Sequence, residues 1–424
     1  MKKIMIVAGL FIVVLFIYFV IKDFQYTPQT EMNQTEEDDE KQDQQNEQQD
    51  QDIINDEYSE YGTSKVQEQI EYMTLDEKIG QLFIAGIDGT ELSDEERDKF
   101  ERHALGGAIF FGDNFDDPKQ TVELMNDFKK LETINQIPLF LSVDQEGGSV
   151  TRLPGLDPLM SAEEIGDTKD PVVAFQSGQL IGKHLQQFGL QLDFAPVLDI
   201  HSNPDNTVIG DRAFGDQEEL VSEMGIKMME GLQGQNVISA VKHFPGHGGV
   251  EADSHQDLPM IEKNYEELKK EELIPFKQAV DAGADMVLVG HLLVKEIDDQ
   301  YPASLSEDVI DILREDWDYD GVVVTDDLTM GAIMQSYSIE EATLQAFKAG
   351  NDILLVAHEE ENIDDAIEGI KQAVQDGEIK ESDIDESVER ILTLKQKYEL
   401  DREPVKDVPI DEMNKEIQEV LEDD

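Results

Sequence analysis

The sequence predicts an α/β fold of the (β/α)8, TIM-like barrel type, and three features of residues 61–400 indicate it. Eight short apolar runs are continuous rather than alternating, which is typical of parallel strands covered on both faces. Segments with helical start and stop signals separate these runs. Polar residues follow nearly every run, as expected where the carboxyl ends of all strands meet at one face. The runs lie at 81–87, 106–111, 138–144, 192–199, 237–244, 285–292, 321–327 and 352–357.

The segments between the runs have recognisable helix ends. Ser93 with Glu96 fits a capping box, and Asp170 before a proline fits an N-cap followed by proline in the first turn. Gly283 and Gly350 stand where a helix would end before the next strand. A doubly wound open sheet is the alternative architecture, but no GxGxxG pattern follows the first run. The barrel is therefore the favoured prediction.

Residues 1–23 predict a transmembrane anchor. Lys2 and Lys3 precede an apolar run of 18 residues, 4–21, which would span about 27 Å as a helix. The positive-inside rule then places the rest of the chain outside the membrane. A cleaved signal peptide, giving a secreted protein, is the alternative. The residues after Ile21 lack the small-x-small pattern that a signal peptidase needs.

Two further segments flank the predicted barrel. Residues 24–60 are rich in Gln, Glu, Asp and Asn with little to bury, so we expect a disordered acidic linker that holds the domain away from the membrane. Residues 401–424 form a short tail of mixed charge, too small for a second domain.

The composition excludes several classes of function. The formal net charge is −63, with 96 Asp and Glu against 33 Lys and Arg, and such a surface repels nucleic-acid phosphates. The same acidity suits a salty working environment, where screening removes the self-repulsion. The chain has no cysteine, which excludes disulfides, thiolate catalysis, thiolate metal sites and a lipidated-cysteine anchor.

Polar residues at the ends of five runs predict one shared site. A single Asp after a strand is more often a cap or turn former than a catalyst, but convergence from five strands favours a functional site. We expect Asp326 to face the cavity and Asp327 to point elsewhere and cap the next turn. The strand-end residues are Asp144, Asp199, Lys242, His243, His291, Asp326 and Asp327.

The longest polar signature is KHFPGHGGVEADSHQDLP, residues 242–259. Asp253 stands two residues before His255, where its carboxylate could accept the imidazole N–H and raise the pKa of the histidine, giving an acid and base. A metal site using His243, His247 and His255 is the competing interpretation. A glycine-rich loop gives neither the regular spacing nor the rigid support of a metal site, so we expect no metal.

At these residues the chain resembles the β-N-acetylglucosaminidases of glycoside hydrolase family 3. The resemblance covers roughly residues 65–400. It rests on five motifs in the family's order, namely VDQEGGSVTRL (143–153), LDFAPVLDI (192–200), VIGDRAFG (208–215), KHFPGHGGVEADSH (242–255) and VTDDLTM (324–330). Some family members have Asp-Thr where this chain has Gly249 and Val250.

The resemblance implies a role for each matching residue. Asp326 would be the nucleophile of a retaining mechanism, and His255, paired with Asp253, would be the acid and then the base. No cofactor is implied. The residues implied to bind the non-reducing sugar are Asp144, Arg152, Arg212, Lys242 and His243.

We therefore expect an exo-acting β-N-acetylglucosaminidase that is anchored to the membrane, works as a monomer and cleaves N-acetylglucosamine-containing glycans or muropeptides from peptidoglycan. Three alternatives remain at this point. They are another β-glycosidase of the same family, such as a β-glucosidase, a metal-dependent hydrolase, and a barrel that binds cell-wall sugar without catalysis.

Overall fold

The computed structural model describes residues 65–131, 137–250, 258–358 and 361–422. Residues 66–424 form one compact unit. The expected anchor (1–23), the expected linker (24–60) and the loop residues Asp253 and His255 lie outside the described residues. Among the described helices, none combines the length and the apolar character needed to span a bilayer.

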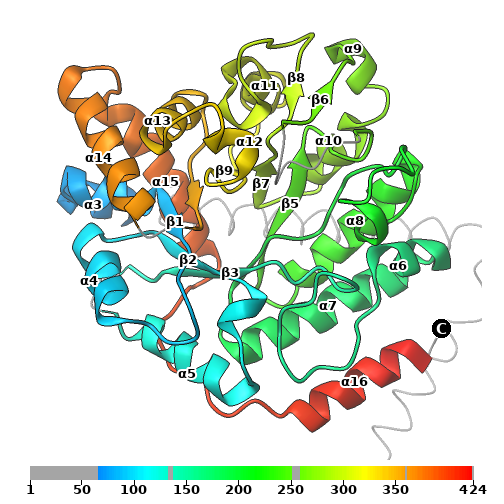
Figure 1. The fold of residues 1–424 in the computed structure, drawn as a ribbon. Coiled ribbons are helices and arrows are strands. Elements are labelled where there is room, and N and C mark those ends of the chain that lie inside the picture. Colours follow the sequence, from blue (N-terminus) through cyan, green and yellow to red (C-terminus); the bar gives the residue numbers. More distant parts are fainter. Residues whose placement is uncertain (1–64, 132–136, 251–257, 359–360, 423–424) are drawn as a thin grey trace, which may run out of the picture. The chain divides into compact units, whose positions relative to one another are not determined.

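A parallel sheet of eight strands forms the centre of the described structure (Figure 1). Each strand lies within one of the eight predicted apolar runs, so those predictions are confirmed. Every residue of these strands is buried, as expected for strands covered on both faces. The strands are β1 (Phe83–Ala85), β2 (Gly107–Phe110), β3 (Phe140–Val143), β4 (Leu192–Asp193), β5 (Ile238–Phe244), β7 (Met286–Val289), β9 (Val322–Thr325) and β10 (Leu354–Val356).

The strand order makes the sheet a nearly closed barrel rather than an open doubly wound sheet. Neighbours follow sequence order from β1 to β9, and the last strand, β10, pairs with β1. A parallel bridge between Val324 and Ile353 links the β9 and β10 sides. All eight carboxyl ends consequently open at one end of the barrel, which is the end that forms the site in this architecture.

Helices surround the strands, and the predicted helix ends are largely confirmed. Ser93 and Glu96 form both bonds of a capping box, and Asp170 caps the helix that begins at Pro171. Gly283 (φ 89°) and Gly350 (φ 106°) adopt the left-handed conformation just before β7 and β10.

The described helices are α3 (Leu75–Gln81), α4 (Asp94–His103), α5 (Pro118–Lys129), α6 (Ala162–Thr168), α7 (Pro171–Phe188), α8 (Glu218–Gln233), α9 (Tyr265–Leu268), α10 (Leu273–Asp281), α11 (Glu307–Asp311), α12 (Gly331–Met334), α13 (Ile339–Lys348), α14 (Glu361–Asp376), α15 (Glu381–Lys397) and α16 (Ile410–Glu422). Short 3-10 turns η1 (Gly112–Asn114), η3 (Gly210–Arg212) and η4 (Ala303–Leu305) and a π-helical turn η5 (Ile312–Asp316) complete them.

A pair of short strands and a helix were not predicted from the sequence. A small parallel pair, β6 (Met260–Ile261) and β8 (Leu293–Val294), lies beyond the barrel strands. The 401–424 segment contains α16, which packs along α7 (Figure 1). Met413 and Ile417 of α16 are buried, and Glu416 pairs with Lys183 at 2.5 Å. The tail is therefore part of the packed domain.

Candidate active site at the carboxyl end of the barrel

A cavity of about 900 Å³, its open mouth included, lies at the carboxyl end of the barrel. Five strand-end residues of the sequence prediction line it, together with Arg152 and Arg212. Its walls also carry apolar side chains. The lining residues are Ile109, Phe111, Asp144, Glu146, Val150, Arg152, Phe194, Val208, Ile209, Arg212, Lys242, His243, His247, Leu288, Asp326, Asp327, Met330, Leu355 and His358.

Asp326 follows the last residue of β9 and lines the cavity. Its main-chain N–H donates to the Val289 carbonyl at 2.9 Å, and its Oδ1 accepts the N–H of Asp327 at 2.9 Å. Burial raises the pKa of Asp326, but His291, His243, the Asp327 N–H and Lys242 together lower it below its ordinary value. The carboxylate of Asp326 is therefore ionised at neutral pH, and hydrogen bonds with the main chain fix its position.

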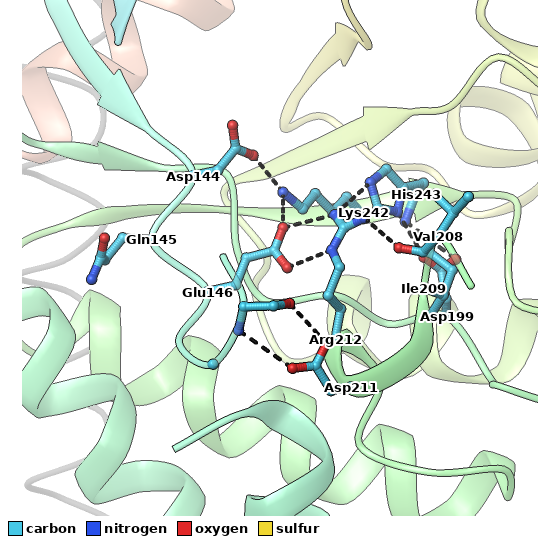
Figure 2. A network of polar contacts seen from close by, with 12 residues as sticks. Asp144, Gln145, Glu146, Asp199, Val208, Ile209, Asp211, Arg212, Lys242 and His243 are labelled. Carbon is cyan, nitrogen blue, oxygen red and sulfur yellow. Dashed lines mark hydrogen bonds and ion pairs between the residues drawn. The ribbon is translucent and has the colours of Figure 1, made fainter. Parts of the chain in front are cut away.

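A network of four charged residues forms one wall of the cavity (Figure 2). Lys242, at the end of β5, contacts Asp144 Oδ1 at 2.5 Å and Glu146 Oε1 at 2.6 Å. Arg212 holds Glu146 with two bonds of 2.8 Å. Burial raises the pKa of Glu146, but Lys242 and Arg212 hold it far below its ordinary value. Each buried charge thus has a partner of opposite sign, which is the condition under which such charges are tolerated.

The Lys242 ammonium stays protonated in this network. Burial alone lowers the pKa of Lys242, but Asp144 and Glu146 raise it above its ordinary value. An ammonium has three N–H donors, and two of them serve these two carboxylates. Together with the Arg212 fork, the ammonium gives this wall a dense set of donors, next to the acceptor oxygens of Asp144.

His243 is oriented from below by Asp199. The His243 Nδ1 lies 2.7 Å from Asp199 Oδ2, and Asp199 is fully buried. The Nε2 of His243 lies 3.4 Å from Arg212 Nη2. Burial raises the pKa of Asp199, but His243 and His247 lower it below its ordinary value. This carboxylate therefore fixes which ring nitrogen of His243 points away from it.

The structure corrects the expectation that every strand-end residue opens onto the cavity. Asp199 lies beneath His243, and His291 is fully buried between Ser304 Oγ (2.7 Å) and the Asp327 carbonyl (2.8 Å), so neither lines the cavity. Side chains are closely packed at the strand ends, so residues such as Asp199 and His291 lie beneath those that line the cavity.

The expectation for Asp327 is half right. Its Oδ1 accepts the Thr329 N–H at 3.0 Å and so caps the next turn, as predicted. It also lines the cavity, which was not predicted. There its Oδ2 pairs with His358 at 2.8 Å, and the His358 ring stacks on Phe111 with centroids 5.1 Å apart.

All five expected sugar-binding residues line this one cavity. They are Asp144, Arg152, Arg212, Lys242 and His243. The Arg152 Nε is buried, and no hydrogen bond to a described residue satisfies it. The expected acid, His255, and its partner Asp253 lie outside the described residues. Val250, three residues before Asp253, is buried and donates its N–H to the His247 carbonyl at 3.3 Å.

Sequence reasoning assigned no role to Glu146 or His247, although both lie within quoted motifs. Glu146 stands two residues after Asp144, and a carboxylate so close to a strand-end Asp was the available signal. His247 was considered only as a metal ligand. Within the described ranges, no three His, Cys, Asp or Glu side chains group closely enough to hold a metal ion.

The site combines an ionised carboxylate with a cup of hydrogen-bond donors and acceptors. Asp326 can act as a nucleophile or stabilise a positive charge, and the Asp144, Lys242 and Arg212 wall can bind the hydroxyl groups of a polar ligand. The apolar side chains of the cavity suit the C–H faces of such a ligand. These properties fit a hydroxyl-rich substrate attacked at an electrophilic carbon.

Comparison with known proteins agrees with this chemistry. Residues 74–394 match the glycosyl hydrolase family 3 N-terminal domain. The chain is 32% identical over 303 residues to a beta-hexosaminidase of Nitrosomonas eutropha, covering 69% of this chain and 85% of that protein. It is 30% identical over 334 residues to beta-hexosaminidase A of Pseudoalteromonas piscicida, covering 73% of this chain but only 56% of that protein.

A solved structure shares the architecture. The family 3 β-N-acetylglucosaminidase of Paenibacillus sp. str. FPU-7 superposes with a TM-score of 0.77 at 38% sequence identity, covering 82% of this chain and 68% of that one. The family match spans well over half of this chain, and the resemblance seen in the motifs is therefore confirmed. The chain belongs to glycosyl hydrolase family 3 and is a glycoside hydrolase.

Proposed function

We propose that the protein is a retaining exo-β-N-acetylhexosaminidase that removes terminal, non-reducing N-acetylglucosamine. The observation that carries the proposal is that Asp326, at the end of β9, lines the same cavity as the polar cup of Asp144, Lys242 and Arg212. The names of the similar proteins, beta-hexosaminidase and β-N-acetylglucosaminidase, support the choice of sugar.

In the proposed mechanism Asp326 attacks C1 of the sugar while His255 protonates the departing glycosidic oxygen. The C1–O bond breaks and a covalent glycosyl-aspartate forms. His255, now neutral, then takes a proton from water as the water oxygen attacks C1, which releases the sugar and restores the Asp326 carboxylate. Asp253 accepts the other imidazole N–H and holds the ring for both steps.

A histidine suits this role on electrostatic grounds. The cavity already holds the carboxylates of Asp144, Glu146, Asp326 and Asp327. A further ionised carboxylate acting as base would add to this negative potential, whereas a neutral imidazole activates water without that repulsion.

The remaining parts of the proposal concern substrate source and location. Peptidoglycan fragments that end in N-acetylglucosamine are the proposed substrates, and the apolar 4–21 segment is the proposed membrane anchor, with the catalytic domain outside and monomeric. If the segment is cleaved, the protein is secreted. Fractionation of cells that express the full chain, with a protease added to intact cells, tests both location and exposure.

Trapping the intermediate tests the reaction class and the nucleophile together. A slow 2-fluoro glycoside or a slow N-acetylglucosaminide should leave a covalent sugar on the peptide that contains Asp326, measured by mass spectrometry after digestion. Label on another residue, or inactivation without any label, would contradict the mechanism. The Asp326→Asn variant is the control and should remain unlabelled.

Two simpler measurements separate the alternatives. Turnover of 4-nitrophenyl N-acetyl-β-glucosaminide should exceed turnover of the corresponding β-glucoside, and the reverse order would indicate a β-glucosidase. Activity that survives dialysis against a chelator would remove the metal-dependent alternative. His255→Ala should lose most turnover on a substrate with a poor leaving group, and full retention would exclude His255 as the acid.

A further inference from the structure

His247 is a buried histidine on the cavity wall whose ring lacks polar partners. Its side chain lines the cavity, and the residue is 2% exposed. Neither ring nitrogen has a hydrogen-bond partner among the described residues. A buried polar group without a partner is destabilising, because it has lost its hydrogen bonds to water. A ligand in the cavity could supply the missing hydrogen bond.

The main chain of His247 is fixed on both sides. Its N–H donates to Asp199 Oδ1 at 2.6 Å, and its carbonyl accepts from Asn206 Nδ2 at 2.9 Å. At Gly248 a Cβ atom would lie 1.9 Å from the Ile200 carbonyl oxygen, so only glycine allows this close approach. The imidazole is thus carried on a rigid support, as a recognition group should be.

The His247 ring is neutral in this setting. Burial lowers the pKa of His247, and the charges of Asp199 and Asp326 oppose this while His243 adds to it, leaving the pKa below its ordinary value. A neutral imidazole offers one N–H donor and one acceptor nitrogen. His247 and the expected nucleophile, Asp326, both line this cavity.

Asn206 connects His247 to an apolar part of the wall. The Asn206 Oδ1 accepts the N–H groups of Val208 (3.0 Å) and Ile209 (3.1 Å), and both of these side chains line the cavity. Asn206 itself is 1% exposed. One buried amide thus holds together a polar imidazole and two branched apolar side chains. Such a wall is complementary to a small group that has both a carbonyl oxygen and a methyl.

We propose that His247 recognises the 2-acetamido group of the substrate and so determines the specificity of the site. The imidazole N–H donates to the acetamido carbonyl oxygen, and the acetamido methyl packs against Val208 and Ile209. The inference rests on the proposed function, in which C1 of the sugar meets Asp326. The acetamido group is attached to C2, next to C1, so it lies near Asp326 in the cavity that His247, Val208 and Ile209 also line.

The test compares two substrates that differ at C2. The kcat/KM for 4-nitrophenyl N-acetyl-β-glucosaminide, divided by that for the β-glucoside, is the specificity ratio. His247→Leu should lower this ratio about tenfold or more, because only the acetamido substrate loses a partner. His247→Gln keeps an N–H donor and should retain most of the ratio.

His184 provides a matched control variant. It is fully buried on α7, and neither ring nitrogen makes a hydrogen bond to a described residue, although Nε2 lies 3.8 Å from Glu416 Oε2. It does not line the cavity. His184→Leu should therefore leave the specificity ratio unchanged, whatever it does to stability. Thermal unfolding of each variant shows whether it is folded.

A measurement on the wild type keeps the inference testable if His247→Leu does not fold. In the 15N-histidine spectrum, the His247 ring signals, assigned with His247→Gln, should move when N-acetylglucosamine is added and stay in place with glucose. An unchanged specificity ratio in His247→Leu, an equal loss on both substrates, or ring signals indifferent to N-acetylglucosamine would overturn the inference. A wild type that prefers the glucoside would instead refute the proposed function, and the inference with it.

Discussion

Two buried lysines lie at opposite ends of the barrel and differ in charge. Lys242 stands at the carboxyl end, 2.5 Å from Asp144 and 2.6 Å from Glu146, and its pKa is raised. Lys395 of α15 reaches the amino end, where it donates to Gln81 Oε1 and to the carbonyl of Gly106, both at 2.8 Å. Burial lowers the pKa of Lys395 to about 7.

The difference lies in the partners, because both side chains are almost completely buried. Carboxylates keep Lys242 charged. Among the described residues Lys395 has only neutral partners, two oxygens and the Phe140 ring 4.6 Å from its Nζ, and burial leaves its amine about half protonated at pH 7. The carboxyl end of the barrel thus holds paired charges that can bind and react with a ligand. The amino end closes the barrel with hydrogen bonds that need no charge.

The largest effect on activity is expected from Asp326→Asn, at the carboxyl end of the barrel. An amide cannot form the glycosyl intermediate, so kcat should fall by more than about 10⁴-fold. The fold should remain, since the main-chain bonds of this residue are unchanged. Steady-state kinetics together with thermal unfolding check both parts. Retained turnover in a preparation whose mass excludes reversion to Asp would contradict the assignment.

Lys242→Met should lower both activity and stability. This would distinguish Lys242 from Lys395, whose replacement should not change kcat. It leaves Asp144 and Glu146 without their shared ammonium, at an expected cost of about 3 kcal/mol in the free energy of unfolding. The kcat/KM should fall about 10²-fold or more because the cup loses a donor. Urea unfolding and steady-state kinetics measure these.

A double-mutant cycle sharpens that prediction. Glu146→Gln alone should also destabilise the protein, because Lys242 and Arg212 then share a neutral amide. If Lys242 and Glu146 act as one pair, Lys242→Met combined with Glu146→Gln costs less than the two single changes added together. Simple additivity would show that the two side chains are not energetically coupled.

Lys395→Met should leave kcat unchanged and alter only the pH dependence of stability. The pKa of Lys395 is about 7 in the folded chain and 10.5 ordinarily, so between these values the unfolded chain binds one more proton. The contribution of Lys395 to the free energy of unfolding therefore rises with pH, by about 1.4 kcal/mol per unit, and is lost as the pH falls toward 7.

Urea unfolding of the wild type and Lys395→Met between pH 7 and pH 10 measures this directly. Taking the difference between the two free energies of unfolding cancels the titration of all groups that the two proteins share. This difference should rise with pH, in favour of the wild type. A difference that does not depend on pH would mean that Lys395 stays charged in the folded protein.

The smallest effect should come from Asn414→Ala on α16, which supports the carboxyl end from outside. The Asn414 side chain accepts the Asp157 N–H at 2.7 Å and donates to the Gly155 carbonyl at 3.0 Å. Those residues follow Arg152 along the chain. Loss of the two bonds should cost about 1 kcal/mol and raise KM a few fold with kcat unchanged. A change in kcat alone would contradict this role.

The sequence predicted most of the fold because its signals are local. Each of the eight apolar runs contains a barrel strand, and the caps at Ser93 and Asp170 form as expected. The β6 and β8 pair escaped prediction because two-residue strands leave no pattern. Helix α16 was not predicted because its buried side chains, Met413 and Ile417, depend on packing against α7, which forms only when the domain folds.

The site was predictable as a set of strand-end residues but not as a network. Asp144, Lys242, His243 and Asp326 were placed correctly in one cavity, since the barrel brings strand ends together. The same rule wrongly placed His291 there, because it cannot distinguish a residue facing the cavity from one packed beneath it.

By itself, the sequence determined the barrel, the family and the residues available at its carboxyl end, because hydrophobic continuity, capping and motif order are all written along the chain. Only the tertiary structure decided which of these residues form ion pairs with one another. Glu146 became the partner of both Lys242 and Arg212, and His247 was left without one, through contacts between residues far apart in sequence. Burial and partner distance set the protonation state of each group, and neither quantity exists before the strands close into a barrel.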